Sequence, residues 1–303
     1  MTQSSQAARG SLLRERLDVQ ARRLTDFWNF YKGSWIGMLG LFIVIGFVIM
    51  AVVAPLITPY DPRALVGRPF QPPMGEHPLG TDQVGRDIYS QLIWGSRVSL
   101  MVGLLASAFG VAIGTIIGLV SGYFRGLPDS ILMRITDLFI TLPGLPLMLI
   151  LAALLGRSMW NIILVIAVTG WTGTARMVRS QTLSIKERPY VEAARSVGAR
   201  DSHIITRHIL PNVFPLVFAN AIVGIVDAIL AESGLSFLGL GDPTKPSWGQ
   251  LLRYANEAGA LATGRWWFII PPGLCIMLVA IGFAFSSYSL DQILNPRLRK
   301  RRW

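Results

Sequence analysis

Four long runs without a charged residue constrain this chain more than any other feature. Each has 19 to 25 residues, and together they cover residues 35–57, 98–122, 138–156 and 266–290. A helix of about 20 apolar residues crosses the hydrocarbon core of a bilayer. Residues 159–175 form a shorter candidate, and residues 213–241 form another that is apolar except for Asp227, Glu232 and its boundaries. The sequence therefore predicts an all-α, polytopic membrane protein with six transmembrane helices.

Composition argues against a soluble alternative. Apolar residues make up 52% of the 303 residues and charged residues only 15%. A soluble fold would need several completely buried helices, and too little chain would remain to cover them with polar surface. The soluble classes are thereby excluded.

The net charge of +11 is concentrated at the two ends of the chain and in one loop. The terminal cations are Arg9, Arg14, Arg16, Arg22, Arg23, Lys32, Arg297, Arg299, Lys300, Arg301 and Arg302. Residues 176–207 add seven cations against three acids, whereas 61–97 and 242–265 are nearly balanced. Basic loops stay on the cytoplasmic side, so both termini are expected there, which agrees with an even number of spans. The charge indicates topology and not nucleic-acid binding.

Residues 12–31 mix apolar side chains with arginines and could form an amphipathic helix on the lipid of the inner leaflet. A partly disordered tail is the alternative. The first 34 residues lack the apolar core of a cleavable signal peptide, so the first span is expected to direct insertion.

Sequence patterns typical of catalysis or metal binding are missing from the chain. None of the four lysines stands in the Gly-Lys-Ser/Thr pattern of a phosphate-binding loop, and no serine has the flanking glycines of a nucleophile elbow. Cys275 is the only cysteine, and His203 and His208 lie five residues apart, on different faces of a helix. No catalytic residue, metal site or cofactor is expected.

Glycines at every fourth position mark the second span: Gly110, Gly114, Gly118 and Gly122. This spacing leaves a bare stripe along a helix, where another backbone can approach closely. The stripe predicts a helix-packing face, either in a moving pathway or in ordinary tight packing. Pro143 and Pro146 predict a kink near the start of the third span.

Asp227 and Glu232 are acids at membrane depth, where a carboxylate is costly and faces protein or a water-filled cavity. Their separation of five residues points them in different directions on one helix. Each could line a translocation path, or could cap or pair with a neighbouring helix.

The segment 190–212, between the fourth and fifth spans, reads YVEAARSVGARDSHIITRHILPN. Pro189 can open a short helix, Glu192 then lies in its first turn, and Gly198 can adopt the positive φ that reverses the chain. Pro211 is expected to start the next span. The pattern looks like a docking element for another protein, but these features alone favour a merely solvated connector.

This segment resembles the EAA loop of ABC-importer permeases. Six positions match in spacing, and they are Glu192, Ala193, Ala194, Gly198, Leu210 and Pro211. His208 stands where the family pattern has isoleucine. Two further stretches, HPLGTDQVGRD at 77–87 and AESGLSFLGLG at 231–241, resemble the C-type subunit of the dipeptide and oligopeptide (peptide/nickel) importers. The resemblance covers about residues 35–295.

The resemblance implies a type I ABC-importer permease in the bacterial cytoplasmic (inner) membrane. Its parts would be a cytoplasmic tail (1–34), a first span with an external loop (35–97), a permease core (98–290) whose EAA loop covers about 176–211, and a basic cytoplasmic tail (291–303). It further implies three kinds of partner: a B-type permease in a heterodimer, two cytoplasmic ATPases, and an extracytoplasmic solute-binding protein. ATP would be hydrolysed by the partners and not by this chain.

Dipeptides or oligopeptides are the expected solutes, with nickel chelates, glutathione or opines as alternatives within the same importer class. A channel or secondary transporter without an ATPase, and a membrane-bound enzyme, are the alternatives from other classes.

Overall fold

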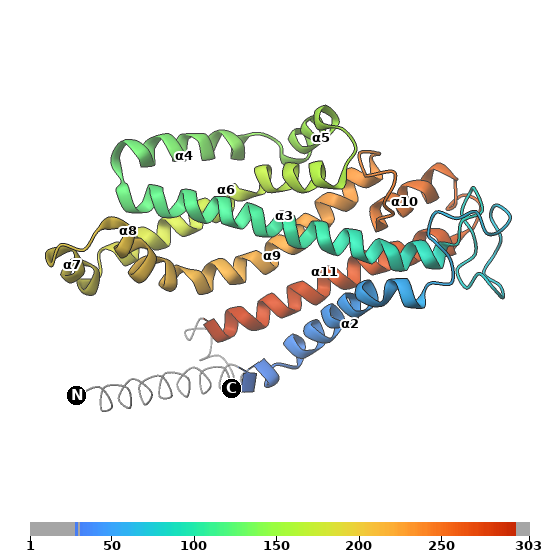
Figure 1. Cartoon of the computed structure of the whole chain (residues 1–303), viewed down its shortest axis with the longest axis horizontal. Helices are drawn as coiled ribbons and strands as arrows, with labels where there is room; N and C mark the ends of the chain where they lie inside the picture. Colours follow the sequence, from blue (N-terminus) through green and yellow to red (C-terminus); the bar gives the residue numbers. More distant parts are fainter. Residues whose placement is uncertain (1–27, 30, 295–303) are drawn as a thin grey trace, which may run out of the picture.

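The computed structural model describes residues 28–29 and 31–294, and within them the chain forms helices joined by turns, with two isolated β-bridges and no strand. Figure 1 shows an elongated bundle. In chain order the helices are α2 (Trp35–Ile57), α3 (Ile88–Phe124), α4 (Gly126–Thr141), α5 (Gly144–Leu155), α6 (Met159–Lys186), α7 (Pro189–Ser196), α8 (Asp201–Ile204), η1 (Ile205–Ile209), α9 (Leu210–Phe237), α10 (Trp248–Glu257) and α11 (Trp266–Leu294). The predicted helix over residues 12–31 lies almost entirely outside the described residues.

The six predicted spans are present. Five helical stretches of the described chain are long and apolar enough to cross a membrane, and the bent pair α4 and α5 brings the number to six when it is counted as one broken span. Helix α3 extends beyond its uncharged run: it begins at Ile88, because the Asp87 carboxylate accepts the Ser90 amide at 2.8 Å and caps its first turn. The all-α, six-span fold class is thereby confirmed.

The third span differs from the expected single helix over 138–156. Helix α4 ends at Thr141 and α5 begins at Gly144, with a bend of 94° between them. Pro143 lies at the break and holds Leu142 in an extended conformation, with ψ of 136°. The predicted kink is therefore real, but it breaks the span into two helices.

The long helices pack through small residues at their closest approaches. Helix α2 lies against α11, where a Cβ at Gly40 would lie 2.7 Å from the Gly282 carbonyl oxygen. A buried apolar cluster around Ile229, Trp248 and Phe268 joins α9, α10 and α11. A second cluster, around Val191 and Ile204, lies at the end of the molecule that carries α7.

The loop between α2 and α3 lies at the opposite end of the bundle from α7 (Figure 1). Asp82 is fully buried and accepts hydrogen bonds from the amides of Val84 and Arg86 and from the Gln91 side chain. His77 Nδ1 lies 3.1 Å from the Asp87 carboxylate. The polar motif at residues 77–87 is thus the folded centre of this loop.

Candidate functional site

Helix α7 presents most of its surface to solvent at one end of the molecule. Pro189 opens it, and Glu192 lies in the first turn, where the helix dipole favours an acid. Val191 is fully buried and anchors the helix to the bundle. Glu192 and Ala193 are exposed, whereas Ala194 is half-buried. The helix therefore offers a face with one acid and small residues that this chain leaves uncovered.

Gly198 ends α7 in a Schellman motif. Its φ is +82°, its own amide donates to the Arg195 carbonyl at 3.0 Å, and the Ala199 amide donates to the Ala194 carbonyl at 3.1 Å. No atom lies within 4 Å of a Cβ built at this position. Backbone conformation, and not lack of space, therefore requires the glycine.

The chain after Gly198 runs without a break into the membrane. α8, η1 and α9 form one helical stretch of 37 residues, Asp201–Phe237. Leu210 donates its amide to the Ile205 carbonyl five residues earlier, a wider turn that directly precedes Pro211, which has no amide hydrogen. Pro211 was expected to start the span. Helix α9 does begin beside it, at Leu210, but α9 continues an unbroken helical stretch that begins earlier, at Asp201, so the expectation is wrong for the start of the continuous helix.

Tyr123 connects this loop to the C-terminal end of α3. Its hydroxyl donates to the Asp201 carboxylate at 2.5 Å, and its carbonyl accepts from the Lys186 ammonium. The Arg195 guanidinium lies over its ring, 5.8 Å from the centroid. Sequence reasoning missed this anchor, and the only signal was a tyrosine directly after the last glycine of the stripe.

The glycine stripe faces α6, which connects directly to this loop. Its members are Gly110, Gly114, Gly118 and Gly122. A Cβ at Gly114 would lie 2.5 Å from the Trp171 carbonyl oxygen, and one at Gly118 would lie 2.6 Å from the Ala175 carbonyl oxygen. Both contacts are with backbone, which cannot move aside as a flexible side chain does. Only glycine therefore fits at these two positions without moving α6.

The structure separates the two acids of the fifth span. Glu232 is 1% exposed and accepts hydrogen bonds from the Ser99 hydroxyl at 3.1 Å and the Ser236 hydroxyl at 2.7 Å. The Ser99 oxygen in turn accepts the Trp248 amide at 3.3 Å. Glu232 thus connects α9 with α3 and α10.

Asp227 is exposed and lines a cavity of about 190 Å³ between α3, α5, α6 and α9. Other polar groups of the lining are Ser107, Thr174 and Asn220. Gly170 and Gly173 leave the α6 wall bare, since nothing lies within 4 Å of a Cβ built at either one. The cavity is a small, mainly apolar recess that carries these few polar groups.

Asp242 fixes the loop that follows α9. Burial alone would raise the pKa of its carboxyl, but hydrogen bonds from Thr244 and the Met159 amide, together with Lys245, outweigh burial and lower the pKa below its usual value. The carboxylate accepts the Met159 amide at 3.3 Å. It therefore links the N-terminal end of α6 to the loop that follows α9.

Comparisons with known proteins identify the class. The family described as "Binding-protein-dependent transport system inner membrane component" matches residues 114–300, and "N-terminal TM domain of oligopeptide transport permease C" matches residues 23–73. The chain belongs to this family of binding-protein-dependent permeases and, as the resemblance implied, to its oligopeptide permease C group.

Named relatives cover nearly the whole chain. The dipeptide transport system permease protein DppC of Bacillus subtilis is 37% identical over 278 residues, which are 91% of this chain and 86% of the relative. The oligopeptide transport system permease protein OppC of the same organism is 34% identical, covering 89% and 88%. The glutathione transport system permease protein GsiD of Pectobacterium atrosepticum is 35% identical, covering 90% and 91%.

A solved structure shares the fold. A chain of the MetNI methionine ABC transporter, in an inward facing conformation, superposes with a TM-score of 0.53 at 20% identity, covering 70% of this chain and 97% of that one. The likeness confirms the expected ABC-importer permease architecture. The wide turn, the α7 element and the bent third span therefore belong to a membrane permease.

Proposed function

We propose that this chain is the transmembrane subunit through which an ATP-driven importer carries dipeptides or oligopeptides across the bacterial inner membrane. The names of its DppC and OppC relatives support the solute class. The relative named for glutathione transport fits the same class, because glutathione is itself a small peptide derivative. Peptides are therefore the first solutes to test.

The main support for this proposal is helix α7, which would be the site where a separate ATPase docks. A short exposed helix fits a groove on a partner, which is a common mode of recognition. Glu192 and Ala193 face away from the bundle, while Val191 holds the helix to it. The Schellman turn at Gly198 then fixes the angle between α7 and the continuous helix Asp201–Phe237.

Movement of α7 would reach the membrane through rigid connections. A displacement of the docked helix would pass through the turn to α9, and through Tyr123 to α3. Packed helices move as rigid bodies and do not deform continuously, so the bundle would switch between two arrangements. This switch is the proposed source of alternating access.

The cavity at Asp227 is the proposed segment of the translocation path in this subunit. An unpaired carboxylate at membrane depth is costly unless it faces protein or water. Asp227 lies with Ser107, Thr174 and Asn220 in the cavity lining. A second, B-type permease facing this cavity would enclose it, and the carboxylate would then attract a cationic or polar group of the solute.

The proposed topology places α7 and both termini in the cytoplasm. Two ATPase subunits would supply ATP hydrolysis, which this chain would not perform itself. The loop of residues 58–87 would face an extracytoplasmic solute-binding protein. Residues 98–290 would form the transport core, preceded by the first span and its loop.

A charge reversal tests the docking site. Glu192→Lys should reduce both ATP-dependent uptake of a labelled dipeptide and co-purification of the ATPases. The control is Glu76→Lys, which makes the same change on an exposed residue of the loop at the opposite end and should retain the ATPases. Competition by tripeptides, glutathione and a nickel chelate would rank the solutes. Uptake that persists without any ATPase subunit would overturn the proposal.

A further inference from the structure

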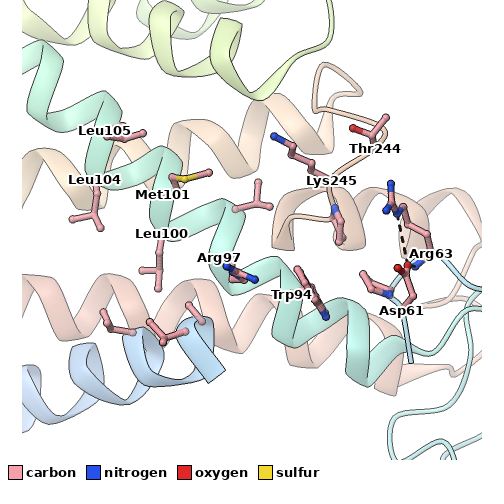
Figure 2. Close-up of a pocket in the computed structure, with 16 residues that line it drawn as sticks. Asp61, Arg63, Trp94, Arg97, Leu100, Met101, Leu104, Leu105, Thr244 and Lys245 are labelled. Carbon is pink, nitrogen blue, oxygen red and sulfur yellow. Dashed lines mark hydrogen bonds and ion pairs between the residues drawn. The ribbon is translucent and has the colours of Figure 1, made fainter. Parts of the chain in front are cut away.

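A lateral groove opens between α2, α3 and the loop that precedes α10. It has a volume of about 810 Å³, within the range of small-molecule sites. Figure 2 shows that its two halves differ in chemistry: charged and polar side chains gather towards the loops, while Leu100, Met101, Leu104 and Leu105 line the other half. The groove is therefore amphipathic along the length of α3.

The apolar half is a trough open to the membrane. Its α3 wall includes Met101 and Leu104, which are 39% and 44% exposed, and its α2 wall includes Val48 and Val52. Leu100 is 4% exposed and forms part of the lining. These residues offer a hydrocarbon-lined surface that no other part of the described chain covers.

The polar half lies at the depth of the membrane interface. Trp94 donates its indole hydrogen to the Thr58 hydroxyl at 3.1 Å, at the end of α2, which is where tryptophans mark the boundary between membrane and water. The Arg97 guanidinium lies over the Trp94 ring, 5.0 Å from its centroid. The cation is thus held at the level of lipid headgroups.

Two of the three cations at this mouth form no close ion pair within the described chain, although Lys245 is near enough to Asp242 to help lower the pKa of that carboxyl. Arg63 lies 3.7 Å from Asp61, but no carboxylate among the described residues lies within ion-pair distance of Arg97 or Lys245. Two cations outside any close ion pair, lying above an apolar trough, complement a molecule with an anionic head and a hydrocarbon tail. A helix of a partner protein could fill the groove equally well only if it carried an acidic side chain at the depth of these two cations.

We propose that this groove binds an anionic phospholipid. The phosphate would lie between Arg97 and Lys245, and one acyl chain would lie along Met101, Leu104 and the α2 wall. The lipid would brace α2 against α3 on the side of the loop 58–87. The site is independent of the transported solute.

The test is a titration of the purified, delipidated importer with phosphatidylglycerol, followed by native mass spectrometry. Phosphatidylcholine with identical acyl chains is the lipid control. The wild type should retain one phosphatidylglycerol that phosphatidylcholine does not replace. The double variant Arg97→Gln, Lys245→Gln should bind it more weakly by about fivefold for each cation removed. The control Arg157→Gln, an exposed cation in the turn between α5 and α6, outside the groove, should bind within about twofold of the wild type.

A second variant keeps the cations and blocks the trough. Val52 is 69% exposed, so Val52→Trp can fill the α2 wall without disturbing the buried core, and it should also weaken phosphatidylglycerol binding. Equal binding of the two lipids, or wild-type affinity in the double variant, would overturn the proposal. Cross-linking of a cysteine at Met101 to another permease in native membranes would overturn it as well.

Discussion

Replacing Gly198 with proline should weaken the attachment of the ATPases to this subunit and so abolish ATP-driven uptake. The native φ of +82° lies in the left-handed region that glycine adopts without strain, whereas proline restricts φ to about −65°. Proline also removes the amide that donates to the Arg195 carbonyl at 3.0 Å, a bond worth about 1 kcal/mol. The turn cannot keep its geometry, so α7 would point away from the direction set by Asp201–Phe237.

A graded series distinguishes backbone conformation from side-chain volume. Asparagine tolerates the left-handed conformation, so Gly198→Asn should transport close to the wild-type rate. Alanine pays about 1–2 kcal/mol there, so Gly198→Ala should be intermediate. No atom lies within 4 Å of a Cβ at this position, so a steric explanation would not give this order.

The assay is ATP-dependent uptake of a labelled dipeptide into proteoliposomes, with ATP hydrolysis measured in parallel. The expected order of uptake is Gly, Asn, Ala and then Pro, and the proline variant should lose most of it. Abundance of each variant in the membrane is the control for folding. Wild-type uptake by Gly198→Pro would refute the reasoning, and so would equal loss in the asparagine and proline variants.

Three further predictions follow from the packing and the charges. Gly114→Ala should destabilise the bundle by about 1–3 kcal/mol, measured by thermal unfolding, because the added Cβ meets the Trp171 backbone; Gly46→Ala, on a site with nothing within 4 Å, should not. Glu232→Ala should lower the unfolding temperature, because it leaves the buried Ser99 hydroxyl without its acceptor. Asp227→Asn, which changes an exposed side chain, should instead lower dipeptide uptake with little effect on stability. The wild type should be more stable than Asp242→Ala at neutral pH. Because folding lowers the pKa of Asp242, this difference in stability should shrink only as pH falls below the ordinary aspartate pKa of about 4.

Each of these has a contradicting result. Equal destabilisation by the two glycine variants would show that the stripe is not close-packed. A Glu232→Ala variant with unchanged stability, or an Asp227→Asn variant with unchanged uptake, would remove the distinction between the two acids. A difference between wild type and Asp242→Ala that vanishes already near pH 6 would show that the carboxyl has no lowered pKa.

The spans were predictable because desolvation of a charge dominates at membrane depth. The first uncharged run, residues 35–57, coincides with α2. The length of the fourth span was underestimated. Its expected end at residue 175 was set by the charge of Arg176, whereas α6 continues to Lys186. Arg179 lies in this added part of the helix, where its guanidinium donates two hydrogen bonds to the Asp129 carboxylate at 2.6 and 2.7 Å. Such a partner cannot be found from local sequence.

Two other features depend on contacts that spacing does not reveal. Helix α10, Trp248–Glu257, is short and polar and was expected only as part of a loop; its fully buried Trp248 finds its place against α3, where the indole donates to the Leu92 carbonyl at 3.0 Å. Helix α7 and its glycine turn were expected from Pro189, Glu192 and Gly198. Their attachment through Tyr123 and Asp201, which are 78 residues apart, was not.

The central claim is that this chain transports only together with separate ATPase subunits that dock on α7. Its most direct test is affinity purification of the tagged chain from gently solubilised native membranes, with mass spectrometry of the proteins that accompany it. A second permease and ATPase subunits should accompany the wild type, and the ATPases alone should be lost from Gly198→Pro. Recovery of the chain by itself, still able to transport in proteoliposomes without ATP, would contradict the account.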